Sequence, residues 1–99
     1  MRKNLDVPVC DMDGEPLTDR GKAATVKSFV VNALAMGAGS NGEQQMTGSE
    51  KMSRYSLAMR LNKGGEQELT PEELALVKTV VGAMYAPLIV GQVFEWADE

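Results

Sequence analysis

The chain has 99 residues, a formal net charge of −4, and one cysteine but no histidine. This length fits a single domain with a modest hydrophobic core. The single cysteine, Cys10, excludes an internal disulfide and is typical of a reducing compartment. The lack of histidine excludes an imidazole base or an imidazole metal ligand.

Residues 1–18 are predicted to form a β-hairpin. The alternation of Leu5, Val7 and Val9 with polar or small residues is typical of a half-buried strand. Because Pro8 has no amide proton, this strand is expected at a sheet edge, or with its proline nitrogen facing outward. A hairpin alone is marginal in water, so we expect it to pack on helices.

The turn of this hairpin is expected at residues 11–14, Asp-Met-Asp-Gly. A two-residue loop would place Cys10 opposite Leu17, whereas a three-residue loop would place Val9 opposite Leu17. The three-residue loop is preferred, because it puts Leu17 on the same face as the apolar strand residues and Gly14 in the left-handed conformation.

A first helix is predicted over residues 25–36, after a polar connection at residues 18–24. Gly37 is expected as its left-handed C-cap. The apolar face predicted for this helix consists of Val26, Phe29, Val30, Ala33 and Leu34.

Residues 37–48 are rich in glycine and polar side chains, which predicts a mobile loop. They do not match a phosphate-binding loop, because they follow a helix and contain no lysine. No phosphate ligand is therefore expected there.

A second helix is predicted over residues 50–63, with Ser49 as its N-cap and two glycines after its end. Its predicted buried face consists of Met52, Tyr55, Ala58 and Met59, extended by Leu57 and Leu61. Its basic side chains are Lys51, Arg54, Arg60 and Lys63. A small nucleic-acid-associated regulator would use these basic residues to contact phosphates, although the overall acidic charge argues against that function.

The last helix is predicted over residues 71–97, with a kink or short break near Pro87. Thr70 is expected as its N-cap, Pro71 at its first position, and Glu73 where a capping box needs a glutamate. Inside it, apolar residues recur at three- and four-residue spacing: Leu74, Val77, Val81, Met84 and Leu88.

The segment after Pro87 is predicted to carry a protein-partner surface, formed most naturally with another copy of the chain. Its side chains leave almost no polar face, and aromatic residues are enriched among interface anchors. The alternative is that the hairpin covers this segment and buries it within one monomer. The predicted partner-binding residues are Leu88, Ile89, Val93, Phe94 and Trp96.

No pattern in the chain specifies a reaction, so catalytic residues, metal ligands and cofactor-binding residues are all predicted to be absent. Residues 11–15 fail as a calcium loop, because aligning Gly14 with the loop glycine places Val9 and Arg20 at ligand positions. No membrane span is expected either. The longest uncharged run, residues 79–94, is shorter than the roughly 20 residues that a membrane-spanning helix needs.

Four stretches carry a resemblance to known sequences. They are Asp-Gly-Glu-Pro-Leu-Thr at 13–18, Glu-Lys-Met-Ser-Arg-Tyr-Ser-Leu-Ala at 50–58, Glu-Leu-Thr-Pro-Glu-Glu-Leu-Ala-Leu-Val-Lys at 68–78 and Tyr-Ala-Pro-Leu-Ile-Val-Gly-Gln at 85–92. With these stretches, nearly the whole chain resembles a group of small uncharacterised proteins encoded by tailed bacteriophages and prophages. The resemblance implies a cytoplasmic, phage-encoded accessory or assembly protein, and supplies no catalytic or binding residues.

These observations predict one α+β domain over residues 1–99, in which an N-terminal β-hairpin packs on three α-helices. An all-α bundle with an irregular N-terminus is the alternative. The expected function is a non-enzymatic protein-interaction domain, either a phage accessory protein or a virion-assembly protein, in the host cell cytoplasm. The nucleic-acid-associated regulator is the alternative function.

Overall fold

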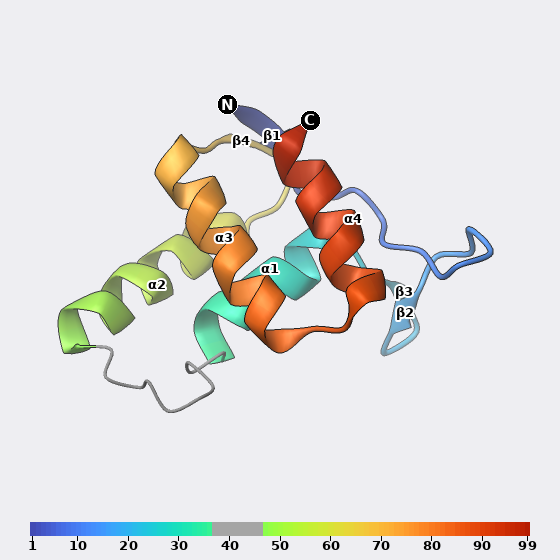
Figure 1. Ribbon diagram of the computed structural model, residues 1–99, viewed down its shortest axis with the longest axis horizontal. Coiled ribbons are helices and arrows are strands. Elements are labelled where there is room, and N and C mark those ends of the chain that lie inside the picture. The colour runs from blue at the N-terminus through green and yellow to red at the C-terminus, as the bar shows by residue number, and fades with distance from the viewer. Residues whose placement is uncertain (37–46) are drawn as a thin grey trace.

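The structure, a computed structural model, describes residues 1–36 and 47–99, and confirms the α+β class. These residues form four helices and two small antiparallel sheets of two strands each (Figure 1). The elements are β1 (Arg2–Asn4), β2 (Thr18–Asp19), β3 (Lys22–Ala23), α1 (Val26–Met36), α2 (Gly48–Leu61), β4 (Glu66–Glu68), α3 (Pro71–Met84) and α4 (Pro87–Asp98).

The first strand pairs with a segment that the sequence did not indicate as a strand. β1 is antiparallel to β4, with Lys3 opposite Gln67. A turn at residues 5–6 ends β1 and interrupts the expected alternation, so Leu5 and Val9 are buried while Val7 is 37% exposed. The prediction of one continuous strand over residues 5–9 was therefore wrong.

The predicted register of the N-terminal turn is confirmed. The Leu17 amide donates to the Val9 carbonyl at 2.8 Å, and the Asp11 amide donates to the Glu15 carbonyl at 2.8 Å. Gly14 has a φ of +85°, as the three-residue loop requires. Pairing is limited to an isolated bridge, because the chain turns away soon after it.

A second, short hairpin lies where a polar connection was predicted. β2 and β3 are joined by Arg20 and Gly21, whose φ values are +57° and +83°. Two positive φ values in a two-residue loop are typical of a type I′ hairpin turn, and a glycine at the second loop position suits it. The sequence prediction for residues 18–24 was wrong, because such a short hairpin has almost no apolar alternation.

α1 follows its prediction closely, with Val26, Val30, Ala33 and Leu34 buried. α2 begins earlier than predicted. Thr47 is its N-cap, because only Thr47 lies three residues before Glu50, the spacing that a capping box needs. Ser49 and Gly48 are helical residues, so the prediction of Ser49 as the cap was wrong. The predicted C-cap Gly37 and most of the predicted mobile loop lie outside the described residues.

α3 and α4 replace the single kinked helix that was predicted. Tyr85 and Ala86 both have extended backbone conformations, so the chain reverses direction before Pro87. The two helices lie side by side (Figure 1). An ion pair between Lys78 Nζ and Asp98 Oδ1 at 2.8 Å joins the middle of α3 to the end of α4.

The hydrophobic core combines α1, α3 and α4 with the C-terminal half of α2 and the N-terminal segment. Of the charged side chains in residues 1–36 and 47–99, that of Lys3 is buried, and its Nζ donates to the backbone carbonyl of Glu99 at 2.8 Å. The largest fully buried side chains are Leu5, Leu61, Leu69, Val9, Val26, Val30, Val77, Val81 and Val93.

Candidate interaction surface

One face of α4 is docked on the N-terminal segment through hydrogen bonds. Gln92 Oε1 accepts from the Cys10 amide at 2.9 Å, and Gln92 Nε2 donates to the Cys10 carbonyl at 2.7 Å. One turn later, Trp96 Nε1 donates to the Asn4 carbonyl at 2.8 Å. The N-terminal segment therefore occupies this face of the helix.

The predicted partner residues on α4 fall into a buried group and a half-buried group. Val93 and Trp96 are buried in the core, so a partner cannot contact them while the fold is intact. Leu88, Ile89 and Phe94 are half-buried, and a partner contact through these three stays a prediction.

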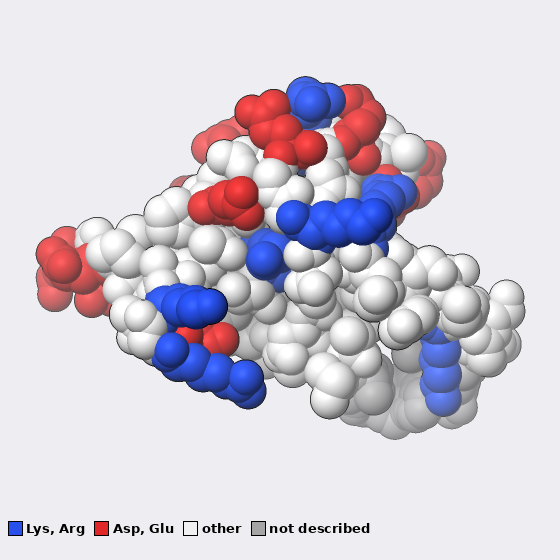
Figure 2. Space-filling view, turned by 180° about the vertical axis from the view of Figure 1, so that it is seen from behind, with Lys and Arg blue, Asp and Glu red and all other residues white. Residues whose placement is uncertain are grey.

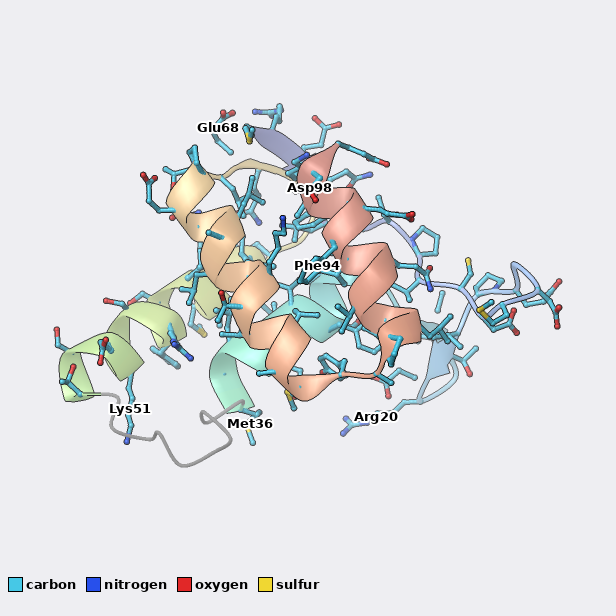
Figure 3. The ribbon with its side chains drawn as sticks, in the orientation of Figure 1. Arg20, Met36, Lys51, Glu68, Phe94 and Asp98 are labelled. Atoms are coloured by element: carbon cyan, nitrogen blue, oxygen red, sulfur yellow. The ribbon has the colours of Figure 1, made fainter. Side chains whose placement is uncertain are left out.

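Part of the half-buried surface on α4 is already covered by α3. Figure 3 shows Phe94 between α3 and α4, and Lys78 Nζ lies 5.1 Å from the centre of its ring. A cation above an aromatic face is a favourable contact, and the same ammonium group is paired with Asp98. The remaining apolar surface of α4 is therefore small.

The four basic residues of the nucleic-acid hypothesis do not form one surface. Arg60 Nη2 is bound to Glu73 Oε1 at 2.9 Å, an ion pair that links α2 to the start of α3. Nine residues separate Lys51 from Arg60, about two and a half turns, so the two side chains leave opposite sides of α2. Figure 2 shows Lys and Arg side chains scattered over the face in view, with uncharged surface and carboxylates between them.

α2 has an apolar stripe that faces away from the core. The predicted buried face contained Met52, Tyr55 and Met59, but these side chains are 59%, 52% and 53% exposed. The helix is instead buried through Leu57, Ala58 and Leu61. Met52, Tyr55 and Met59 are therefore available for contact with a partner.

The side of α2 that faces the core is set by where the helix packs against the rest of the domain. Its buried residues all lie in its C-terminal half, where it packs against α1. In the N-terminal part, from Gly48 to Ser56, no residue is buried, and this part of the helix projects from the body of the domain (Figure 1). Bulky apolar residues therefore remain in solvent, within the described part of the chain.

Two lysines accompany this stripe. Lys51 leaves the first turn and points away from the helix axis (Figure 3), and Lys63 is exposed just past the C-terminal end. The one glutamate of the helix, Glu50, is used in the capping box with Thr47. We call the surface formed by Met52, Tyr55, Met59, Lys51 and Lys63 the outward face of α2; it is apolar along its length and positively charged at both ends.

A shallow hollow of about 500 Å³ flanks the outward face on the side toward α3. Serines 49, 53 and 56 line it, and the Arg60–Glu73 pair closes its far side. A docked side chain on the outward face would have room to enter this hollow.

A larger hollow of about 710 Å³ lies beside α1, near the β2–β3 hairpin. Its rim includes the hydrogen bond from Asn32 Nδ2 to Tyr85 Oη at 2.7 Å and the edge-to-face packing of Phe29 on Tyr85. Asp19 is the one carboxylate among its described lining residues, so it offers no pair of acids for acid–base catalysis. The hollow carries no recognisable chemistry.

The described residues do not form a metal or nucleophile site. Within residues 1–36 and 47–99 no three His, Cys, Asp or Glu side chains gather closely enough to hold a metal ion. Asp11 Oδ1 accepts from the amides of Asp13 and Glu15, so it stabilises its own turn. Cys10 is half-buried, and the chain has no histidine to activate it.

In comparisons with known proteins, no family model, curated protein or solved structure matches the chain. None of the helices in residues 1–36 and 47–99 has the length and apolar character needed to cross a membrane.

Proposed function

We propose that this chain is a non-enzymatic protein-interaction domain whose contact surface is the outward face of α2. The observation that carries the proposal is the exposure of Met52, Tyr55 and Met59 on one side of a helix. Large apolar side chains that are exposed together on one surface are typical of interaction sites, whereas single exposed ones are ordinary. Methionine adapts its shape to a partner, and tyrosine is a common interface anchor.

The projecting half of α2 supports the same proposal. A short helix with little tertiary packing is marginally stable in water. The Thr47–Glu50 capping box stabilises the first turn of α2, although this part of the helix contributes little to the core. A stable helix that exposes an apolar stripe flanked by lysines is well suited to bind a partner helix whose apolar surface is bordered by carboxylates.

The proposal includes a biological role for the domain. The resemblance to small phage and prophage proteins suggests an accessory or virion-assembly role in the host cytoplasm, and the single cysteine suits that compartment. Nucleic-acid binding is less favoured, because Arg60 is already paired and the basic residues are spread around α2.

A photo-crosslinking amino acid at position 59, in cells that express the intact gene, tests this function. We expect a discrete covalent adduct from position 59, which a Tyr55→Glu substitution suppresses. Met12, which is 87% exposed in the N-terminal turn, is the matched control for an exposed methionine. Equal, diffuse adducts from positions 59 and 12, or none from either, would show that the outward face of α2 has no protein partner.

A further inference from the structure

We infer that the partner of the outward face of α2 is the outward face of α3 on a second copy of this chain. We give this name to four exposed residues of α3: Glu72, Ala75, Thr79 and Ala83. The inference rests on the proposed function, because it names the occupant of the same surface. Its first support is that the chain carries two helix faces of opposite character.

The shapes of the two faces are complementary. The named residues of the outward face of α2 have long or large side chains, whereas the α3 face beyond Glu72 consists of the small residues Ala75, Thr79 and Ala83. Thr79 Oγ1 donates to the Ala75 carbonyl at 3.0 Å, so its hydroxyl is satisfied within the helix. Small side chains let two helices approach closely, and large ones from the partner then fill the space between them.

The charges of the two faces are also complementary. Lys51 and Lys63 border the face on α2, and Glu72 is exposed in the first turn of α3. Residues 1–64 contain nine Lys and Arg against seven Asp and Glu, whereas residues 65–99 contain one Lys against seven Asp and Glu. That one lysine, Lys78, is held by Asp98. Pairing two α2 faces would instead bring lysines together, which is unfavourable.

The spacing of the two faces agrees in an antiparallel arrangement. Read in opposite directions, residues 63, 59, 55 and 52 on one copy stay in step with residues 72, 75, 79 and 83 on the other to within one residue, about 1.5 Å along a helix. Reversed, they place Lys63 beside Glu72, Met59 beside Ala75 and Met52 beside Ala83. Lys51 then lies near the C-terminal end of α3, where the helix dipole favours a positive charge.

Two different faces of one chain make this contact heterologous. Each added copy leaves one face of each kind unoccupied, so association continues into chains or closes into a ring. The contact involves one helix face per copy, which is smaller than a standard interface, and association should be reversible and dependent on concentration. Such growth suits an assembly protein.

Sedimentation velocity over a dilution series tests the inference with two surface variants. Tyr55→Glu places a charge on the face of α2, and Ala75→Arg places a long cation on the face of α3. Both positions are exposed, and circular dichroism will confirm that each variant is folded. Met12→Glu, at the exposed turn, is the matched control.

We expect wild type and Met12→Glu to grow beyond a dimer with increasing concentration, and each face variant to stay monomeric. A mixture of the two face variants should stop at a 1:1 dimer, because the intact α2 face of one can meet the intact α3 face of the other. Growth of Ala75→Arg like wild type, or a mixture that stays monomeric, would overturn the inference.

A second test exchanges the charges of Lys63 and Glu72, with little change in the size of either side chain. Lys63→Glu and Glu72→Lys alone should each weaken association roughly tenfold, because a like-charge pair replaces an attractive one. The double variant should recover association, since both faces then carry the exchanged charges. No recovery would contradict the pairing of these two residues.

The crosslinking and sedimentation results separate the inference from the proposed function. A monomeric wild type with a position-59 adduct to a different protein overturns the second copy and leaves the function standing. A monomeric wild type without any adduct overturns both.

Discussion

The side-chain amide of Gln92 bonds both backbone groups of Cys10, accepting from its amide at 2.9 Å and donating to its carbonyl at 2.7 Å. The side-chain amide thus satisfies both backbone groups of Cys10, as a neighbouring strand would do. Since Cys10 precedes the N-terminal turn, this contact attaches the turn to α4. Together with the packing of α4 on α3, it leaves the segment after Pro87 largely covered within one chain.

Replacing Gln92 with leucine should destabilise the domain by about 1–3 kcal/mol. The substitution leaves two partly buried backbone groups without their partner, and unsatisfied buried groups cost about this much. Urea denaturation measures the change, and amide exchange at Cys10 should become faster. Glu95→Ala, at an exposed position of α4, is the control. If Gln92→Leu unfolds at the same urea concentration as this control, the contact does not stabilise the fold.

Thr70→Ala should lower the free energy of unfolding by about 1 kcal/mol. Thr70 Oγ1 accepts from the Glu73 amide at 3.1 Å, and Glu73 Oε1 accepts from the Thr70 amide at 2.9 Å. The substitution removes the first of these bonds and weakens the start of α3. Thr79→Ala, inside the same helix and exposed, should change stability little. Equal effects of the two substitutions would contradict a capping role for Thr70.

The elements predicted correctly are those whose signals are local. The cap at Thr70, the register of the turn at Gly14 and the buried face of α1 each depend on residues within one or two turns of one another. The strand β4 was missed, because its partner β1 lies more than 60 residues away and three polar residues form it. No short window of sequence contains that pairing.

The candidate site was harder to predict for a related reason. Hydrophobic spacing showed that α2 has apolar residues, but Met52 and Leu57 are both apolar and only the packing decides which is buried. On α4 the reverse occurred: Trp96 is buried, and its indole N–H donates to the carbonyl of Asn4, which is distant in sequence. Exposure of an apolar residue is a tertiary property.

The ion pair between Arg60 and Glu73 should make stability depend on pH in the acid range. The hydrogen-bonded guanidinium of Arg60 lowers the pKa of Glu73, and the hydrogen bond that the Thr70 backbone amide donates to the carboxylate lowers it further. A carboxylate with a lowered folded pKa contributes stability that is complete above its unfolded value, about 4.3 for glutamate. That contribution is lost as the pH falls through the folded pKa.

Arg60→Gln should therefore be less stable than wild type at neutral pH, and the difference should shrink as the solution is acidified. Urea midpoints at several pH values from neutral to strongly acid measure it. Arg54→Gln removes a charge from the same helix without touching this pair, and should not show the convergence. A difference between Arg60→Gln and wild type that stays constant with pH would exclude the ion pair as its cause.

Among the glycines of residues 1–36 and 47–99, Gly64 is the one where a larger residue should be least tolerated. Its φ is +73°, and a Cβ added there would lie 2.8 Å from Asp6 Oδ1. The carboxylate cannot move without loss, because Asp6 Oδ2 accepts from the Gly65 amide at 3.1 Å. Gly64→Ala should therefore destabilise the domain by more than the roughly 1–2 kcal/mol that the left-handed conformation alone costs an alanine.

Gly65→Ala is the matched control, because Gly65 has a similar φ of +70° but nothing lies within 4 Å of its added Cβ. Its cost should be that of the conformation alone. Combining Gly64→Ala with Asp6→Ala removes the carboxylate that the new methyl group meets. The double variant should then be more stable than the sum of the two single effects predicts, a coupling that a double-mutant cycle by urea denaturation measures. If Gly64→Ala and Gly65→Ala cost the same, or the cycle shows no coupling, Asp6 is not what restricts position 64 to glycine.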